Sequence, residues 1–154
     1  GLVYELNSKL DKREEIRVVQ GVTSSISAAA SLGAPLMHDF CQISLSDLMT
    51  DWSLIEKRLE LASMADFVIC IYNPKSKGRP NHLKRAFEIM QAYKPATTPV
   101  GIVKNAGRTN EEKYIKTLES MDFEVCDMST MIIVGNKETY IDGDKIITPR
   151  GYGI

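Results

Sequence analysis

Residues 67–72 read FVICIY, and residues 73–80 continue as NPKSKGRP. An uninterrupted apolar run of six residues is typical of a strand that is buried on both faces. The Pro, Gly, Lys and Arg residues that come next indicate a loop where the strand ends. We therefore expect a central strand whose carboxyl end opens into a basic loop.

Shorter apolar runs and amphipathic stretches alternate on both sides of this strand. The apolar runs predict strands at residues 16–19, 41–45, 99–103 and 131–134. Amphipathic and capped stretches predict helices at residues 26–32, 52–64, 81–93 and 111–118, the last one capped by Asn110. Near the end, Asp142-Gly143-Asp144 separates two short strand candidates and predicts a hairpin. The expected fold class is α/β, with a mixed, mostly parallel sheet flanked by helices and a C-terminal antiparallel hairpin.

Size and composition limit the classes of function. The 154 residues suit one compact domain, and 19 Lys and Arg balance 20 Asp and Glu, so no overall charge attracts nucleic acid or an anionic membrane surface. Three cysteines without CxxC spacing favour a reducing, cytoplasmic location. Two histidines do not supply an ordinary His-rich site, so no metal is expected. No apolar run approaches the roughly 18 residues that a membrane-spanning helix needs.

The first ten residues, GLVYELNSKL, have apolar side chains at helical spacing but no capping residue ahead of them. We expect residues 1–13 to be the end of a preceding domain or a linker helix, and residues 14–154 to form the self-contained domain. The alternative is a natural terminus left after removal of an initiator Met.

Ligands of open α/β sheets bind outside the carboxyl ends of the strands, so the loops at those ends are candidate sites. One of them is GVTSS at residues 21–25. Its glycine allows close backbone approach, and the N–H groups at the helix start favour a polar or anionic ligand. The segment matches neither nucleotide-phosphate fingerprint, GxxxxGK[ST] or GxGxxG. The alternative is an ordinary capped helix start.

Basic side chains gather in two further loops. Lys75, Lys77 and Arg79 lie in the loop after the central strand, and Lys104 and Arg108 follow the strand at residues 99–103. Such clusters bind carboxylates or phosphates. For the loop after the central strand, the alternative is a solvated turn whose charges favour solubility.

Residue type alone makes His38, Asp39 and Asp47 candidates for acid/base catalysis, because His titrates near neutrality and a carboxylate can orient it. Adjacent residues on an extended segment point in opposite directions, so His38 and Asp39 need not form a working pair. The alternative is a hydrogen-bonded structural histidine. We expect His82, at a helix start, to be a polar cap.

Taken together, these segments resemble the class III tetrapyrrole methyltransferases, in order and over essentially the whole chain. Two features are similar to the family in general: GVTSSISAAASLGAPL at residues 21–36 and PVGIVKNAG at 99–107. Three are similar to the branch that methylates C17: HDF with ISLSD at 38–47, YNPKSKGRP at 72–80 and TPRGY at 148–152. Gln20 stands where the family usually has Pro.

The resemblance implies a two-domain enzyme of cobalamin biosynthesis that binds S-adenosylmethionine (SAM) between its domains. It implies methyl transfer to C17 of a precorrin-3B-type tetrapyrrole with ring contraction, and a homodimer. Carried over by position, the cofactor-binding residues are Thr23, Ser24, Tyr72, Ala106 and, more weakly, Met131. The macrocycle is a flat polycarboxylate, which gives the five basic residues a substrate-binding role. Ring contraction involves proton movement, for which His38, Asp39 and Asp47 are the candidates.

GLVYEL resembles the stretch that follows the family's glycine-rich cofactor loop, and that loop is not in this sequence. We therefore expect the chain to carry half of the cofactor site, to bind SAM weakly and to turn over little alone. Two other interpretations stay open: methylation at a different corrin position or of another target, and a binding or dimerisation module without catalysis.

Overall fold

The computed structural model describes residues 1–76 and 78–152. In chain order the elements are α1 (Leu2–Asn7), α2 (Ser24–Leu32), β1 (Gly33–Ala34), β2 (Phe40–Ser44), α3 (Trp52–Met64), β3 (Val68–Tyr72), α4 (His82–Gln91), β4 (Pro99–Lys104), β5 (Glu112–Thr117), the 3-10 helix η1 (Phe123–Val125), β6 (Thr130–Val134), β7 (Tyr140–Asp142) and β8 (Lys145–Ile147). None of the helices in these ranges is long and apolar enough to cross a membrane.

The main sheet has the strand order β2-β3-β6-β4-β5. The α/β class, the mixed sheet and the antiparallel hairpin of β7 and β8 are confirmed. The expectation of a mostly parallel sheet needs correction, because β2 and β3 are parallel whereas β6 is antiparallel to both β3 and β4. Residues 118–129 return the chain to the edge where β4 ends, and β6 therefore runs opposite to β4.

Two local predictions are wrong. Residues 111–118 form no helix, since Glu112–Thr117 pairs along its full length with β4 as an edge strand. Tyr114 packs on one face of the sheet and Ile115 on the other, so strand alternation replaces helical periodicity. Residues 16–19 form no strand, because they lie in the extended segment after α1, where Ile16 is half-buried, residues 17–19 are exposed and no partner strand is present.

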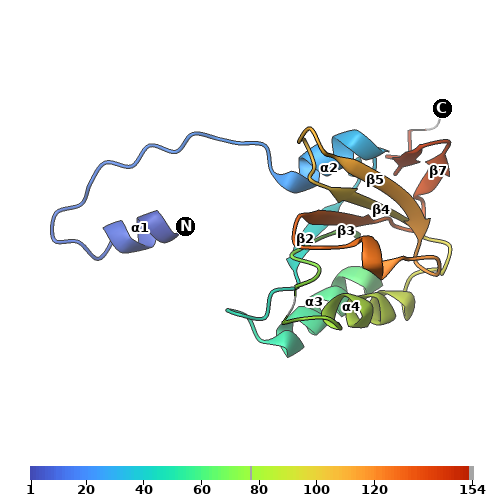
Figure 1. Ribbon diagram of the computed structural model, residues 1–154, viewed down its shortest axis with the longest axis horizontal. Coiled ribbons are helices and arrows are strands. Elements are labelled where there is room, and N and C mark those ends of the chain that lie inside the picture. Colours follow the sequence, from blue (N-terminus) through green and yellow to red (C-terminus); the bar gives the residue numbers. More distant parts are fainter. Residues whose placement is uncertain (77, 153–154) are drawn as a thin grey trace.

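Helices cover both faces of the sheet (Figure 1). On one face α3 and α4 pack through Ile55, Leu59 and Phe87, among others, and on the other α2 packs through Ala28 and Leu32. β3 is buried on both faces, as the run FVICIY predicts: Ile69 and Ile71 contribute to one core, Val68 and Cys70 to the other.

Gly101 in β4 sets how closely α2 approaches the sheet. A Cβ atom at this position would lie 2.8 Å from Leu32 Cδ2, closer still to Cδ1, and 3.0 Å from Ile146 Cδ1. Contacts this short require a neighbour to move. The glycine therefore permits the close packing of Leu32 and Ile146 on β4, and the first turn of α2 lies where β3 and β4 end.

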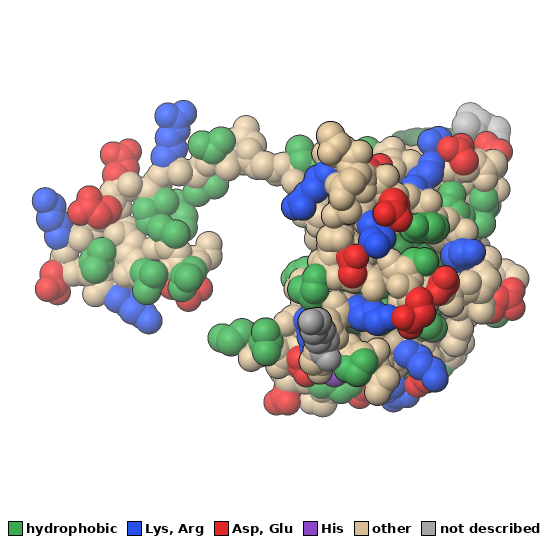
Figure 2. Space-filling view, viewed as in Figure 1, with side chains coloured by type: hydrophobic (Ala, Val, Ile, Leu, Met, Phe, Trp, Pro, Cys, Tyr) green, Lys and Arg blue, Asp and Glu red, His purple; other side chains and the backbone are tan. Residues whose placement is uncertain are grey.

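The segment before α2 makes few contacts with the rest. α1 has no buried residue and is followed by a long extended segment that leads to α2 (Figure 1). Its contacts are local, such as the 2.8 Å hydrogen bonds between the Asn7 side chain and the backbone of Glu14. Figure 2 shows apolar side chains on this helix beside charged ones. The division into residues 1–13 and 14–154 remains a prediction.

Candidate functional site

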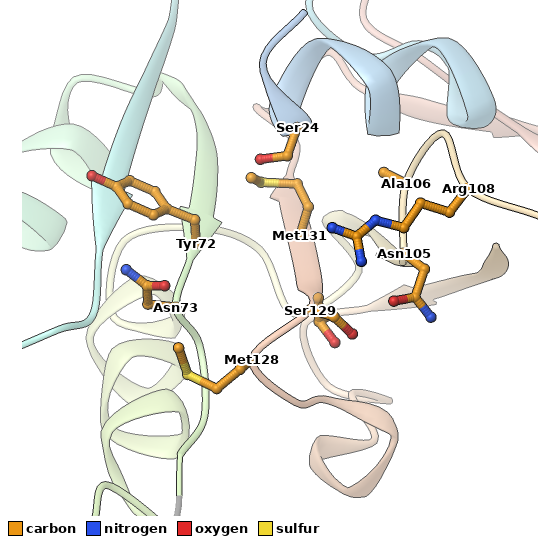
Figure 3. A pocket seen from close by; sticks show the side chains of 10 residues that line it. Ser24, Tyr72, Asn73, Asn105, Ala106, Arg108, Met128, Ser129 and Met131 are labelled. Atoms are coloured by element: carbon orange, nitrogen blue, oxygen red, sulfur yellow. The ribbon is translucent and has the colours of Figure 1, made fainter. Parts of the chain in front are cut away.

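A cavity of about 240 Å³ opens where β3 and β4 end and β6 begins. The strand register brings these ends together, because Ile71 near the end of β3 lies opposite Ile132 of β6, and Lys104 at the end of β4 lies opposite Thr130 at the start of β6. The loops after β3 and β4, the segment before β6 and the start of α2 line it (Figure 3): Ser24, Tyr72, Asn73, Asn105, Ala106, Arg108, Met128, Ser129, Thr130 and Met131.

The structure brings four of the five predicted cofactor-binding residues together. Ser24, Tyr72, Ala106 and Met131 come from four separate segments and all line the cavity. Thr23, the fifth, is the N-cap residue of α2; its side chain makes no capping hydrogen bond and does not line the cavity. The first N–H groups of a helix lack partners within the helix, so the start of α2 adds polar donors beside Ser24.

The backbone adopts the same left-handed conformation directly after β3 and directly after β4, in each case at an asparagine. Asn73 directly follows β3 with φ 52°, and Asn105 directly follows β4 with φ 51°. Left-handed backbone is unfavourable for most side chains, and Asn tolerates it better than most. The Asn73 side chain donates to Ser44 Oγ at 3.1 Å, and the Asn105 N–H donates to the Ser129 carbonyl at 3.1 Å. The sequence reasoning missed both residues, although an Asn directly after each of two buried strands was a usable signal.

The left-handed turn at Asn105 gives a testable prediction. Asn105→Val should lower the free energy of unfolding by about 1–2 kcal/mol, because a β-branched residue resists positive φ. Asn105→Gly should change it by no more than about 0.5 kcal/mol, since glycine adopts this conformation freely. Urea unfolding of both variants, with exposed Thr109→Val as the control, measures this. Equal losses in the valine and glycine variants would contradict it.

An acidic side chain organises the segment before β6. The Asp127 carboxylate accepts from the Ser129 N–H at 2.8 Å, from its hydroxyl at 2.6 Å and from Thr130 Oγ1 at 3.1 Å, and it pairs with Lys104 Nζ at 3.2 Å. Partial burial opposes ionisation, but these donors outweigh it and lower the pKa of Asp127 to about 2. The same carboxylate raises the pKa of Lys104.

The lowered pKa of Asp127 predicts a pH dependence. A carboxyl with a pKa of about 2 in the folded chain and about 3.9 when unfolded stabilises the fold above pH 3.9 and loses that effect as the pH falls toward 2. Asp127→Asn should therefore cost about 1 kcal/mol at pH 7, a value reduced by solvent screening because the side chain is 50% exposed. Urea unfolding between pH 7 and pH 3 should show the difference from wild type shrinking below pH 4. A difference that stays constant to pH 3 would refute the assignment.

The predicted substrate-binding cations have different surroundings. Arg108 lines the cavity, and its guanidinium turns toward it in Figure 3. Lys104 is paired with Asp127, and Lys75 Nζ bonds the Phe123 carbonyl and Glu124 Oε1, both at 3.2 Å. Arg79 is buried beneath the loops. Lys77 lies outside the described residues.

The predicted acid/base residues lie at opposite ends of β2. His38 and Asp39 precede β2, on the order of 13 Å along the strand from its carboxyl end, and the Asp39 N–H donates to His38 Nδ1 at 2.8 Å. Asp47 follows β2 at the carboxyl edge, and its Oδ2 lies 3.0 Å from His82 Nε2. The expectation that His82 is a polar cap is wrong, because Asn81 is the N-cap residue of α4 and the His82 ring packs against Trp52 with centroids 4.1 Å apart.

Comparison of the sequence with known protein families identifies the family to which the chain belongs. Residues 1–122 match the family described as Tetrapyrrole (Corrin/Porphyrin) Methylases. The chain is 60% identical over 152 residues to a probable cobalt-factor III C(17)-methyltransferase of Salmonella typhimurium, covering 99% of this chain and 63% of that protein. It is 45% identical to a precorrin-3B C(17)-methyltransferase of a Sinorhizobium species, covering 92% of this chain and 58% of the relative.

A solved structure has the same fold. The crystal structure of the methyltransferase CobJ superposes with a TM-score of 0.84 at 36% identity, over 88% of this chain and 56% of that one. The chain thus spans less than two thirds of the length of each of these three proteins.

Proposed function

The chain belongs to the tetrapyrrole methylase family, and on that basis we propose that it carries part of the site of a SAM-dependent methyltransferase. The cavity between α2, β3, β4 and β6 is the proposed cofactor site. One observation carries the proposal: the cavity is lined by Ser24, Tyr72, Ala106 and Met131. The family resemblance of the sequence predicts these four residues as cofactor-binding without use of the structure.

The chemical character of the cavity fits the cofactor. Tyr72, Met128 and Met131 offer aromatic and apolar contact for a flat base, while Ser24 and Asn105 offer hydrogen-bonding groups. When bound, SAM supplies an electrophilic methyl group on its sulfonium. In this proposal Ser24 contacts the cofactor inside the cavity, and Thr23 contacts it beside the cavity lining at the start of α2. Ala106 allows backbone approach to the adenosine, and Met131 lies near the adenine.

For the substrate, we propose a precorrin-3B-type macrocycle methylated at C17 with ring contraction in cobalamin biosynthesis. Two relatives named for C17 methylation support it, one with cobalt-factor III as its substrate and one with precorrin-3B. Transfer to a carbon nucleophile needs alignment and exclusion of water more than a strong base, which suits a lining without histidine. Arg108 is proposed to meet a carboxylate. Of the acid/base candidates, Asp47 lies beyond the carboxyl end of β2, on the same side of the sheet as the proposed site. His38 and Asp39 lie at the amino end of β2, away from the proposed site.

Carbon-13 labelling of the donor methyl group tests the position. The macrocycle, with and without cobalt, is incubated with labelled SAM and with the full-length protein that the gene encodes. We expect the label at C17. A label on another ring carbon would overturn the branch assignment, and no label on either macrocycle would overturn the proposed reaction.

The 154-residue chain should bind SAM weakly. Its cavity of about 240 Å³ is smaller than the roughly 300–1,000 Å³ of most small-molecule sites. We expect a dissociation constant on the order of 1 mM. In an NMR titration, the signals of Ser24, Tyr72, Ala106 and Met131 should move with added SAM while those of α3 stay in place. Micromolar affinity by calorimetry would contradict the half-site interpretation, and unmoved cavity signals would contradict the site itself.

A further inference from the structure

Arg79 is a buried cation, and each of its three guanidinium nitrogens contacts another part of the protein. The residue is 7% exposed. Its Nη1 donates to the Leu45 carbonyl at 2.6 Å and to the Asn73 carbonyl at 3.5 Å, and its Nε donates to Ser76 Oγ at 3.2 Å. Nη2 lies 3.8 Å from Met128 Sδ. A guanidinium is costly to bury unless such partners satisfy it, so these contacts define its role.

These partners join three segments that are far apart in the sequence. Leu45 follows β2, Asn73 follows β3, and Met128 precedes β6. Asn73 and Met128 line the proposed cofactor cavity and lie on the same side of it in Figure 3. Asn73 has left-handed backbone, and its carbonyl at this turn accepts from Arg79 Nη1. One side chain therefore contacts two parts of the cavity wall.

A second layer orients the guanidinium. Asp47 Oδ1 lies 3.8 Å from Arg79 Nε, and Asp47 Oδ2 lies 3.0 Å from His82 Nε2. The His82 ring packs on Trp52, the first residue of α3. Asp47 is thus held by the first residue of α4 and faces Arg79, which gives the buried charge a fixed counterion.

We propose that Arg79 is a positioning residue that shapes the Asn73 and Met128 walls of the cavity, and that Asp47 and His82 hold it in place. This replaces the substrate-binding role that its charge suggested, because the side chain is buried and Nε, Nη1 and Nη2 each contact another part of the protein. The link to cofactor binding rests on the proposed function; the effect on the two walls does not.

NMR spectroscopy of Arg79→Met tests the proposal in the unliganded chain. The Met128 methyl signal and the Asn73 amide signal should move. The Leu45 amide, which donates to the Tyr72 carbonyl at 3.1 Å, should exchange its hydrogen about tenfold faster. The Met90 methyl signal and the Ile71 amide, both in the buried core, should stay as in wild type. Arg79→Lys keeps the charge without the fork of donors and should show the same pattern.

Arg85→Met is the matched control. It removes an arginine one turn into α4 that pairs with Glu56 at 2.7 Å on the surface, and it should leave Met128 and Leu45 unchanged. Unmoved Met128 and Asn73 signals in Arg79→Met would overturn the proposal, and so would equal acceleration of all amides, which indicates a general role in stability. If Arg79→Met does not fold, Asp47→Asn provides the same readout: Met128 and Leu45 should change in the same direction by a smaller amount, and no change overturns the proposal.

Adding SAM separates the two hypotheses. If wild type responds at the cavity, Arg79→Met should need about tenfold more ligand for the same response; an unchanged requirement would refute the link to binding. If wild type does not respond, the proposed function fails, whereas the unliganded spectra still decide the role of Arg79.

Discussion

Replacing Gly101 by valine should destabilise the fold by about 3 kcal/mol and displace α2 from the sheet. The first added carbon already lies within 3.0 Å of both Leu32 and Ile146, and valine adds two more. β4 is paired on both sides, and Leu32 and Ile146 are buried, so either their side chains must repack or α2 must shift. Urea unfolding measures the loss, and the amide signal of Ser24 should move because the start of α2 lines the cavity.

The control for this prediction is Gly21→Val, where nothing lies within 4 Å and the cost should stay within about 0.5 kcal/mol. A second variant identifies the obstructing atoms. Leu32→Ala removes the methyl groups that the valine meets, so the double variant should be more stable than the sum of the two single losses predicts. Wild-type stability of Gly101→Val, or simple additivity in the double variant, would refute the close contact between Gly101 and Leu32.

Local sequence patterns identified those elements whose own residues determine them. The helix predicted at residues 52–64 has those bounds, and the strand predicted at residues 67–72 begins one residue later, because an amphipathic helix and a doubly buried strand each have a distinct pattern. Residues 111–118 are different: their spacing suits a helix, but an edge position beside β4 determines their conformation. The insertion of β6 between β3 and β4 is a long-range pairing that no local pattern encodes.

Some features of the candidate site could likewise be predicted from the sequence, and others could not. Ser24, Tyr72, Ala106 and Met131 could be named from the sequence because loops at strand ends converge in this class of fold. The hydrogen-bond and ion-pair partners of the basic residues could not be predicted from the sequence. Lys75 and Lys104 find acidic partners in the segment at residues 122–129, which follows β5 and was predicted as no element at all. The partner of His82 was equally hidden, since Asp47 is 35 residues away in the sequence.

Replacing Lys94 by methionine should lower the free energy of unfolding by about 3–4 kcal/mol, the largest loss that we expect from a single side chain. Lys94 is 3% exposed, and its ammonium donates to the Phe67 carbonyl at 2.9 Å, to the Gly135 carbonyl at 3.0 Å and to Asp66 Oδ1 at 3.2 Å. Burial lowers the pKa of this ammonium more than the charge of Asp66 raises it, so the buried charge is itself costly. The methionine variant removes the hydrogen bonds that this ammonium donates to the two carbonyls.

Methionine has a similar length and fills the space, so the loss reports the missing donors rather than a void. Lys57→Met, on the exposed surface of α3, is the matched control and should change stability by less than about 0.5 kcal/mol. Asp66→Asn separates the ion pair from the carbonyl contacts: it removes the charge but leaves both carbonyls bonded, and it should cost less than half as much as Lys94→Met. Equal losses in these two variants would place the stabilisation in the ion pair, and a loss in Lys94→Met no larger than the control would show that the two carbonyls do not depend on Lys94.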